Sequence, residues 1–309
     1  MSSQPQMVPG CFMNMLIHAH EQQTAPQNVF VHEPHMSTQS EVVPDPDQSQ
    51  QMTTTHDSNP EPKFIDPDVP FALEKLKKIP KEIQEIVDGL SVQIGTNHSI
   101  EISSPDGMYL EKVVESIPYS ELLQVFLNDW LDISVLHWFA MYFFESPNSG
   151  CAFFNPHMIK EDACIKNRGG VIEHIQEVFS FHVDKTFYLA PYIASEHWSL
   201  IIICPATEMG YIIDSVRGKK ESDYLLTSTI NDAFDMPFNW EMVKCKHQKS
   251  GWECGFMVTK HMYEFVTSIQ YDFHNNLWNT SGCLPQKQID TFILELMPQC
   301  ISKLFAGGI

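Results

Sequence analysis

Basic residues are scarce in this 309-residue sequence. It has 19 lysines and arginines against 39 aspartates and glutamates, and its formal net charge at pH 7 is −20. Phosphate backbones and anionic membrane surfaces repel a chain with this balance. We therefore expect no direct nucleic-acid binding and no membrane association.

Long apolar runs are also missing. The longest run, VLHWFAMYFF at 135–144, is too short to span a bilayer and indicates a buried helix. The N-terminus has neither a basic segment nor a cleavable apolar segment, so we do not expect secretion. The content of 43% apolar and 11% aromatic residues is typical of a soluble globular protein with a sizeable core.

Paired cysteines are absent as well. The eight cysteines are scattered singly and none forms a C-x-x-C pair, which argues against a zinc ribbon or a thioredoxin-like redox pair. Without a secretory signal, we interpret them as reduced thiols of an intracellular protein. We expect no cofactor and no metal.

Composition divides the chain into three parts. Residues 1–62 are rich in Gln, Pro, Ser, Thr, Met and His and precede the first basic residue, Lys63; we predict a disordered polar tail with dispersed histidines. Residues 63–108 are predicted to be an N-terminal extension that packs on the main domain. Their helical pattern at 71–90 is interrupted at Pro80, and a strand or hairpin follows at 91–103. Residues 109–309 form the predicted main domain.

The main domain mixes helices and strands. A short helix and a longer, buried helix are expected within 118–144, with Asn128 or Asp129 as the N-cap of the second and His137 as a core histidine. Further elements follow from periodicity: helices at 171–181, 221–235, 254–269 and 286–305, and strands at 186–194, 197–204, 210–215 and 240–246. This mixture predicts an α+β fold.

Two of these strands bring a histidine and an aspartate together. His197 opens one strand and Asp214 ends the next, and only a few residues separate the two strands. An antiparallel hairpin would place both side chains at the same end. A carboxylate beside an imidazole fixes its tautomer and stabilises its charged form.

Cys254 lies where a loop passes into a helix. Unpaired backbone N–H groups and the helix dipole favour a thiolate there, and a nearby His197 would make it a nucleophile. Attack on a carbonyl creates an oxyanion that needs donors. The Cys254 backbone N–H is one candidate, and the Gln248 side-chain amide, six residues upstream, is another.

The order His197-Trp198, Asp214-Ser215 and QKSGWECG (248–255) resembles the Ulp/SENP family of ubiquitin-like-protein-specific cysteine proteases. The spacings of 17 residues from His197 to Asp214 and six from Gln248 to Cys254 are similar to those of that family. FLNDWLDISVLHWF (126–139) is similar to its N-terminal signature. The resemblance covers about 115–270. Within the family, the phrasing from 130 to 159 looks most like the Ulp-type domains of plant transposable elements.

The resemblance implies a papain-like α+β fold of the adenain/Ulp type. It also implies hydrolysis of the peptide or isopeptide bond after the C-terminal Gly-Gly of a ubiquitin-like modifier, of the SUMO type or related, and of its conjugates. By this resemblance Cys254 is the nucleophile, His197 the general base and acid, Asp214 the orienting group and Gln248 the oxyanion donor.

Substrate-binding residues carry over with one departure. Trp198 would form one wall of a tunnel that admits only glycine. Phe126 stands where we align the signature tryptophan of the other wall, and Asn128 and Asp129 continue that signature. Glu253 replaces the usual aspartate before the cysteine.

Three alternatives remain open from the sequence. Seven of the 39 acidic residues precede Lys63, which leaves 32 acidic and 19 basic residues beyond the tail. SUMO offers acidic surface to its proteases, so another modifier is an alternative. A catalytically silent, transposon-derived modifier-binding or adaptor domain is a second, and an acyltransferase using the same Cys-His-acid arrangement is a third. The resemblance favours the nucleus slightly over the cytoplasm.

Overall fold

The computed structural model describes residues 73–77, 81–95, 98–146, 150–268 and 272–306. The predictions for residues 1–62 and for Pro80 lie outside these ranges. Residues Lys63–Ile309 belong to one compact unit. Within the described residues, no helix is both long and apolar enough to cross a membrane.

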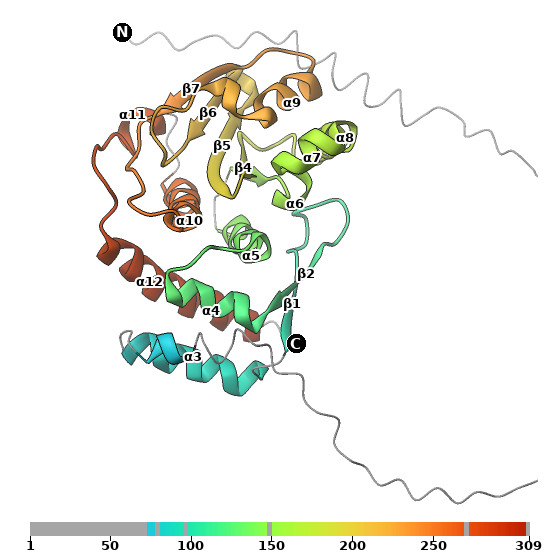
Figure 1. Cartoon of the computed structure of the whole chain (residues 1–309). Coiled ribbons are helices and arrows are strands. Elements are labelled where there is room, and N and C mark those ends of the chain that lie inside the picture. Colours follow the sequence, from blue (N-terminus) through green and yellow to red (C-terminus); the bar gives the residue numbers. More distant parts are fainter. Residues whose placement is uncertain (1–72, 78–80, 96–97, 147–149, 269–271, 307–309) are drawn as a thin grey trace, which may run out of the picture. The chain divides into compact units, whose positions relative to one another are not determined.

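A five-stranded mixed sheet is the centre of this unit (Figure 1). The central strands are antiparallel, and the two edge strands run parallel to their neighbours. In spatial order the strands are β3 (Cys151–Phe153), β4 (Phe187–Ala194), β5 (His197–Cys204), β6 (Met209–Ile213) and β7 (Asn239–Val243). The three central strands confirm the sequence prediction for this region.

Helices cover both faces of the sheet. Strands β4 and β5 are buried at almost every position, as expected for nearly continuous apolar strands enclosed on both sides. On one side α10 (Glu253–Thr267) packs between β5 and α5 (Ile133–Phe144). On the other side lies a group of four helices, of which α6 and α7 pack on β4: α6 (Pro156–Ile159), α7 (Glu161–Lys166), α8 (Arg168–Phe181) and α9 (Leu225–Phe234).

A two-stranded sheet packs beside α5. The strands β1 (Ser99–Ser103) and β2 (Val114–Pro118) form an antiparallel pair, and β2 packs on α5. This pair crosses the predicted boundary at residue 108. The remaining elements are α3 (Lys81–Ile94), α4 (Tyr119–Leu127), α11 (Phe273–Asn276), α12 (Gln286–Ala306) and two 3-10 turns, η1 (Pro205–Thr207) and η2 (Glu221–Asp223).

Two local predictions need correction. The N-cap of α5 is Asp132, whose carboxylate accepts a hydrogen bond from Ser134 N at 2.8 Å. Asn128 instead ends α4 in the left-handed conformation with φ 54°, so neither it nor Asp129 is the cap. Residues 91–94 belong to α3 rather than to a strand, because α3 continues its buried face through Leu90 before ending at Gly95, which has φ 80°.

Several short elements were not predicted. These are β2, β3, α6, α7 and α11, each of only three to six residues. Such elements have too few residues to show a clear periodicity. One clear local signal was present at α6, because Asn155 caps it and Pro156 stands at its first position.

Candidate active site

The β5–β6 hairpin brings His197 and Asp214 together. Leu200 pairs with Ile213 in this hairpin, so Asp214, the next residue, reaches the end of the sheet where His197 begins β5. His197 Nε2 and Asp214 Oδ1 are 2.8 Å apart. The proximity expected from the sequence is therefore present.

A tight turn directs the chain into His197. Ser195 and Glu196 connect β4 to β5 and have φ of 48° and 62°, the positive values that two-residue hairpin turns require. Glu161 holds this turn, because its carboxylate accepts hydrogen bonds from Ser195 N at 2.9 Å and from Ser195 Oγ at 3.0 Å. The position of His197 thus depends on α7 as well as on the sheet.

Asp214 is buried and held by three donors. Besides His197, its carboxylate accepts hydrogen bonds from Val216 N and from Tyr224 Oη, each at 2.6 Å. Burial raises the pKa of Asp214, but the hydrogen bond and charge of His197 and the bonds from Tyr224 and Val216 outweigh burial and lower it. Asp214 is therefore an ionised acceptor. Tyr224, which the sequence reasoning missed, contacts this carboxylate from the loop before α9.

His197 is poised to be charged. Burial lowers its pKa, but hydrogen bonds and charge interactions with Asp214 and Cys254 outweigh burial and raise the pKa from 6.5 to about 9. An imidazole that is bonded to a carboxylate and interacts with a thiol can transfer a proton at the thiol while the carboxylate stabilises the cation.

Cys254 is the second residue of α10, which begins one residue earlier than expected. Its side chain is buried, and Sγ lies 3.6 Å from Gly251 O. The next residue must be glycine for a packing reason. A Cβ on Gly255 would lie 2.9 Å from Leu131 Cβ, closer than side-chain contacts normally allow. Cys-Gly therefore lets α10 approach the chain just before α5.

The loop before Cys254 is folded by its own polar side chains. Glu253 is 3% exposed, and its carboxylate accepts hydrogen bonds from the backbone N–H groups of Ser250, at 3.0 Å, and Lys249. An acidic residue before the cysteine therefore has a local role in shaping this loop. Gln248 N also donates to Ser215 O at 3.2 Å, which ties the loop to the end of β6.

Gln248 is oriented by Ser215. Ser215 Oγ donates a hydrogen bond to Gln248 Oε1 at 2.6 Å, and Gln248 Nε2 donates to Ser250 O at 3.0 Å. The Ser250 carbonyl oxygen can only accept, so it sets which end of the amide is the NH₂ group, and the Ser215 hydroxyl then donates to the amide oxygen. One amide hydrogen binds the loop and the other remains for a further acceptor. Adjacent residues, Asp214 and Ser215, thus hold the histidine and the glutamine.

The predicted substrate-binding residues differ in how deeply they are buried. Trp198 is 1% exposed and donates from Nε1 to Leu131 O at 3.1 Å. Phe126 is 2% exposed on the inner face of α4, where it packs among the buried residues of that helix. Asn128 Nδ2 donates to Asp290 Oδ1 at 3.3 Å, and Asp129 lies 3.8 Å from Lys75 Nζ.

Trp130 is the aromatic residue that the sequence reasoning missed. It is 46% exposed, and a Cβ on Gly251 would lie 3.4 Å from its ring. It therefore lies against the loop that leads to Cys254. The sequence Trp130-Leu131-Asp132 directly precedes α5, four residues after Phe126.

Comparison with known proteins gives a family for this arrangement. The profile of the Ulp1 protease family, C-terminal catalytic domain, matches residues 134–304. The comparison with curated proteins gives no match.

Several solved structures are similar in fold. A SUMO protease Ulp1 with its catalytic cysteine oxidised to a sulfenic acid is 14% identical, with a TM-score of 0.50, and the match covers 73% of this chain and 97% of that chain. The C-terminal Ulp1 protease domain in complex with Smt3, the yeast orthologue of SUMO, is 13% identical, with a TM-score of 0.49 and coverage of 78% and 97%. The Ulp1-like SUMO protease catalytic domain of Chaetomium thermophilum is 18% identical, with a TM-score of 0.41 and coverage of 60% and 78%.

The family profile spans more than half of the chain and includes His197, Asp214, Gln248 and Cys254. The α+β fold around a mixed sheet agrees with this match. This chain therefore belongs to the Ulp1 protease family and carries its catalytic domain.

Proposed function

We propose that this domain is a cysteine peptidase that cleaves the peptide or isopeptide bond after the C-terminal Gly-Gly of a ubiquitin-like modifier. The observation that carries the proposal is His197, which is hydrogen-bonded to Asp214 at 2.8 Å and whose raised pKa reflects interaction with both Asp214 and the Cys254 thiol. This arrangement supports a nucleophilic sulfur with a base beside it. The chemistry requires no cofactor.

In the proposed acylation step the Cys254 sulfur attacks the carbonyl carbon of the terminal glycine. The oxyanion accepts hydrogen bonds from Cys254 N and from the free amide hydrogen of Gln248. His197 then gives its proton to the leaving amine, and the C–N bond breaks to leave a thioester. In the second step His197 takes a proton from water and the water oxygen attacks the thioester carbon. The C–S bond then breaks, the modifier leaves with a free carboxylate, and the Cys254 thiolate and the protonated His197 are restored. Asp214 holds the imidazole throughout.

Glycine specificity follows from the limited access to the sulfur. Cys254 is 0% exposed and Trp198 is 1% exposed, so the acyl group has to enter through a narrow space. A residue without a Cβ fits such a space best. We propose Trp130 as the exposed aromatic residue over which the modifier tail passes. The modifier of one similar structure is Smt3, the yeast orthologue of SUMO.

The choice of modifier and the cellular compartment follow from charge and thiol chemistry. The domain beyond residue 62 has 32 acidic and 19 basic residues, and like charges at an interface are unfavourable. A ubiquitin-like modifier with a less acidic surface than SUMO would suit this domain better. We place the enzyme in the nucleus or cytoplasm, where its cysteines stay reduced.

The test is a panel of modifiers that carry a C-terminal electrophile. We expect one of them to label the wild-type chain and to leave Cys254→Ser unlabelled. Labelling that persists in Cys254→Ser and maps to another cysteine contradicts the assignment of the nucleophile. A modifier that binds the wild type tightly without labelling it indicates the silent adaptor instead.

A further inference from the structure

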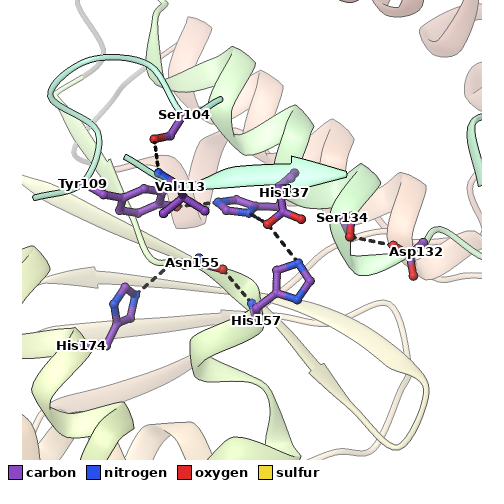
Figure 2. A network of polar contacts seen from close by, with 10 residues as sticks. Ser104, Tyr109, Val113, Asp132, Ser134, His137, Asn155, His157 and His174 are labelled. Atoms are coloured by element: carbon purple, nitrogen blue, oxygen red, sulfur yellow. Dashed lines mark hydrogen bonds and ion pairs between the residues drawn. The ribbon is translucent and has the colours of Figure 1, made fainter. Parts of the chain in front are cut away.

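A buried carboxylate meets two histidines at a place that the proposed reaction does not use. Glu115 comes from β2, His137 from α5 and His157 from α6. Their ligand atoms, one from each residue, all lie within 4.8 Å of one another. Figure 2 shows the two imidazoles converging from different elements. The fold thus gathers three metal-ligating side chains from distant parts of the sequence.

The contacts within this cluster are unequal. Glu115 Oε1 lies 2.6 Å from His137 Nδ1 and 3.1 Å from His157 Nε2. The first contact is a hydrogen bond, whereas the Nε2 atom of His157 is buried and has no partner with hydrogen-bond geometry. The other ring nitrogen of His137 lies 2.9 Å from the hydroxyl of Tyr109. His157 is therefore the incompletely bonded member.

The backbone holds these side chains in place. Glu115 is 7% exposed because β2 alternates buried and exposed positions, and His137 is 0% exposed in the core helix. Asn155 caps α6 by accepting a hydrogen bond from His157 N at 2.9 Å, and Asn155 N donates to His174 Nε2 at 3.1 Å (Figure 2). The start of α6, and with it His157, is thus fixed to α8. The His157 side chain is 32% exposed, so the cluster lies near the surface of the domain on this side.

We propose that Glu115, His137 and His157 bind a divalent transition-metal cation of the Zn²⁺ class, with water in a fourth position. Two imidazoles and one carboxylate are a ligand set that suits this class. In a tetrahedral site with bonds of about 2.0–2.1 Å, ligand atoms lie roughly 3.4 Å apart. The two contacts of 2.6 and 3.1 Å are shorter than that, so admitting the ion requires the imidazole nitrogens to move away from the carboxylate oxygen by less than about 1 Å.

Tyr109 supports this proposal. A metal-bound imidazole normally donates its second N–H to a neighbouring acceptor, which fixes the ring. With the ion on Nδ1 of His137, the Nε2–H group would donate to the Tyr109 hydroxyl 2.9 Å away. A hydroxyl can either donate or accept, so Tyr109 suits the cluster with and without the ion. The cation would join β2, α5 and α6 and compensate the buried carboxylate.

Metal binding can be measured on the full chain with Co²⁺ as the probe, in a Cys254→Ser background that removes the thiol beside His197. The parent is compared with His157→Gln and with His98→Gln, whose histidine is exposed and outside the cluster. All three proteins keep the same other cysteines and the histidines of residues 1–62, so those ligands cancel in the comparison. Visible absorption counts bound Co²⁺, and thiolate ligation is recognised by its near-ultraviolet charge-transfer band.

We expect the parent and His98→Gln to bind one more equivalent of Co²⁺ than His157→Gln, without added thiolate absorption. Zn²⁺ at about 100 times its dissociation constant should raise the Tm of the parent by about 5–10 °C more than that of His157→Gln. Equal binding and equal Tm shifts overturn the proposal and leave a hydrogen-bonded cluster only. If His157→Gln does not fold, the result for the parent alone decides. A parent that binds no Co²⁺, or whose bound Co²⁺ shows only thiolate-type spectra, also overturns the proposal.

Discussion

Replacing Ser215 with alanine tests whether the orientation of the Gln248 amide supports the proposed reaction. The Ser215 hydroxyl donates to Gln248 Oε1 at 2.6 Å, so its loss frees the amide to rotate. One neutral hydrogen bond contributes about 1 kcal/mol, which corresponds to roughly a fivefold slower hydrolysis. Gln248→Ala removes the donor itself and should slow hydrolysis by roughly 10²–10³. Ser215→Ala is therefore expected to be a small fraction of the Gln248 effect.

The assay measures two rate constants for the wild type, both single variants and the double variant. Hydrolysis of a modifier–fluorophore substrate passes through an oxyanion, whereas alkylation of Cys254 by iodoacetamide does not. We expect hydrolysis to slow in all three variants and alkylation to change little. His197→Ala is the contrasting control, because it removes the partner of the thiolate and should slow both reactions.

The double variant gives the decisive comparison. If Ser215 acts through the amide, adding Ser215→Ala to Gln248→Ala should cost nothing further, and the coupling should equal about 1 kcal/mol. An equal slowing by Ser215→Ala in both backgrounds would refute this reasoning. Slower alkylation in Gln248→Ala would show instead that the glutamine shapes the loop, since its Nε2 also donates to Ser250 O at 3.0 Å.

Other predictions concern stability. The pKa of His197 is raised from 6.5 to about 9, so its pairing with Asp214 should contribute up to about 3 kcal/mol to the free energy of unfolding. This contribution is fully present below pH 6.5 and is lost as the pH rises through about 9. The Tm difference between wild type and Asp214→Asn should therefore narrow over that range, and a constant difference would argue against the pair. Gly255→Ala should lower the free energy of unfolding in urea by about 1–3 kcal/mol, because its Cβ would lie 2.9 Å from a neighbouring leucine. Gly169→Ala, which has open space around it, should raise the free energy of unfolding by up to about 1 kcal/mol. The 63–309 fragment should match the full chain in Tm and in turnover, and a large drop in either would show that residues 1–62 pack on the domain.

The sequence by itself determined the features that depend on neighbouring residues. Apolar β-branched runs predicted β4, β5 and β6, and the short connection between the last two predicted their antiparallel pairing. Because a hairpin brings the ends of its strands together, the approach of His197 to Asp214 followed from the same local pattern. The start of α10 at the Cys254 segment was predicted to within one residue.

Residues that depend on distant packing were harder to place. Phe126 was aligned with a tunnel wall, yet Tyr119, Leu122, Leu123 and Phe126 follow helical spacing and are all buried. That spacing was available in the sequence. The position of Trp130 was not, because it depends on contact with the distant loop at Gly251. The cap of α5 was misplaced for a related reason. Asn128 and Asp129 were the two candidates, but Asn128 takes the left-handed position that ends α4 and Asp132 caps α5.

Only the tertiary structure could decide the contacts between segments far apart in the chain. Ser215 lies 33 residues from Gln248, and Glu115 lies 22 residues from His137. No periodicity predicts such pairs, because strand order and helix packing determine which side chains meet. His137 was expected to be a satisfied core histidine, and its ring is bonded on both sides. That one of its partners is a buried carboxylate shared with His157 became visible only when β2 and α6 were placed against α5.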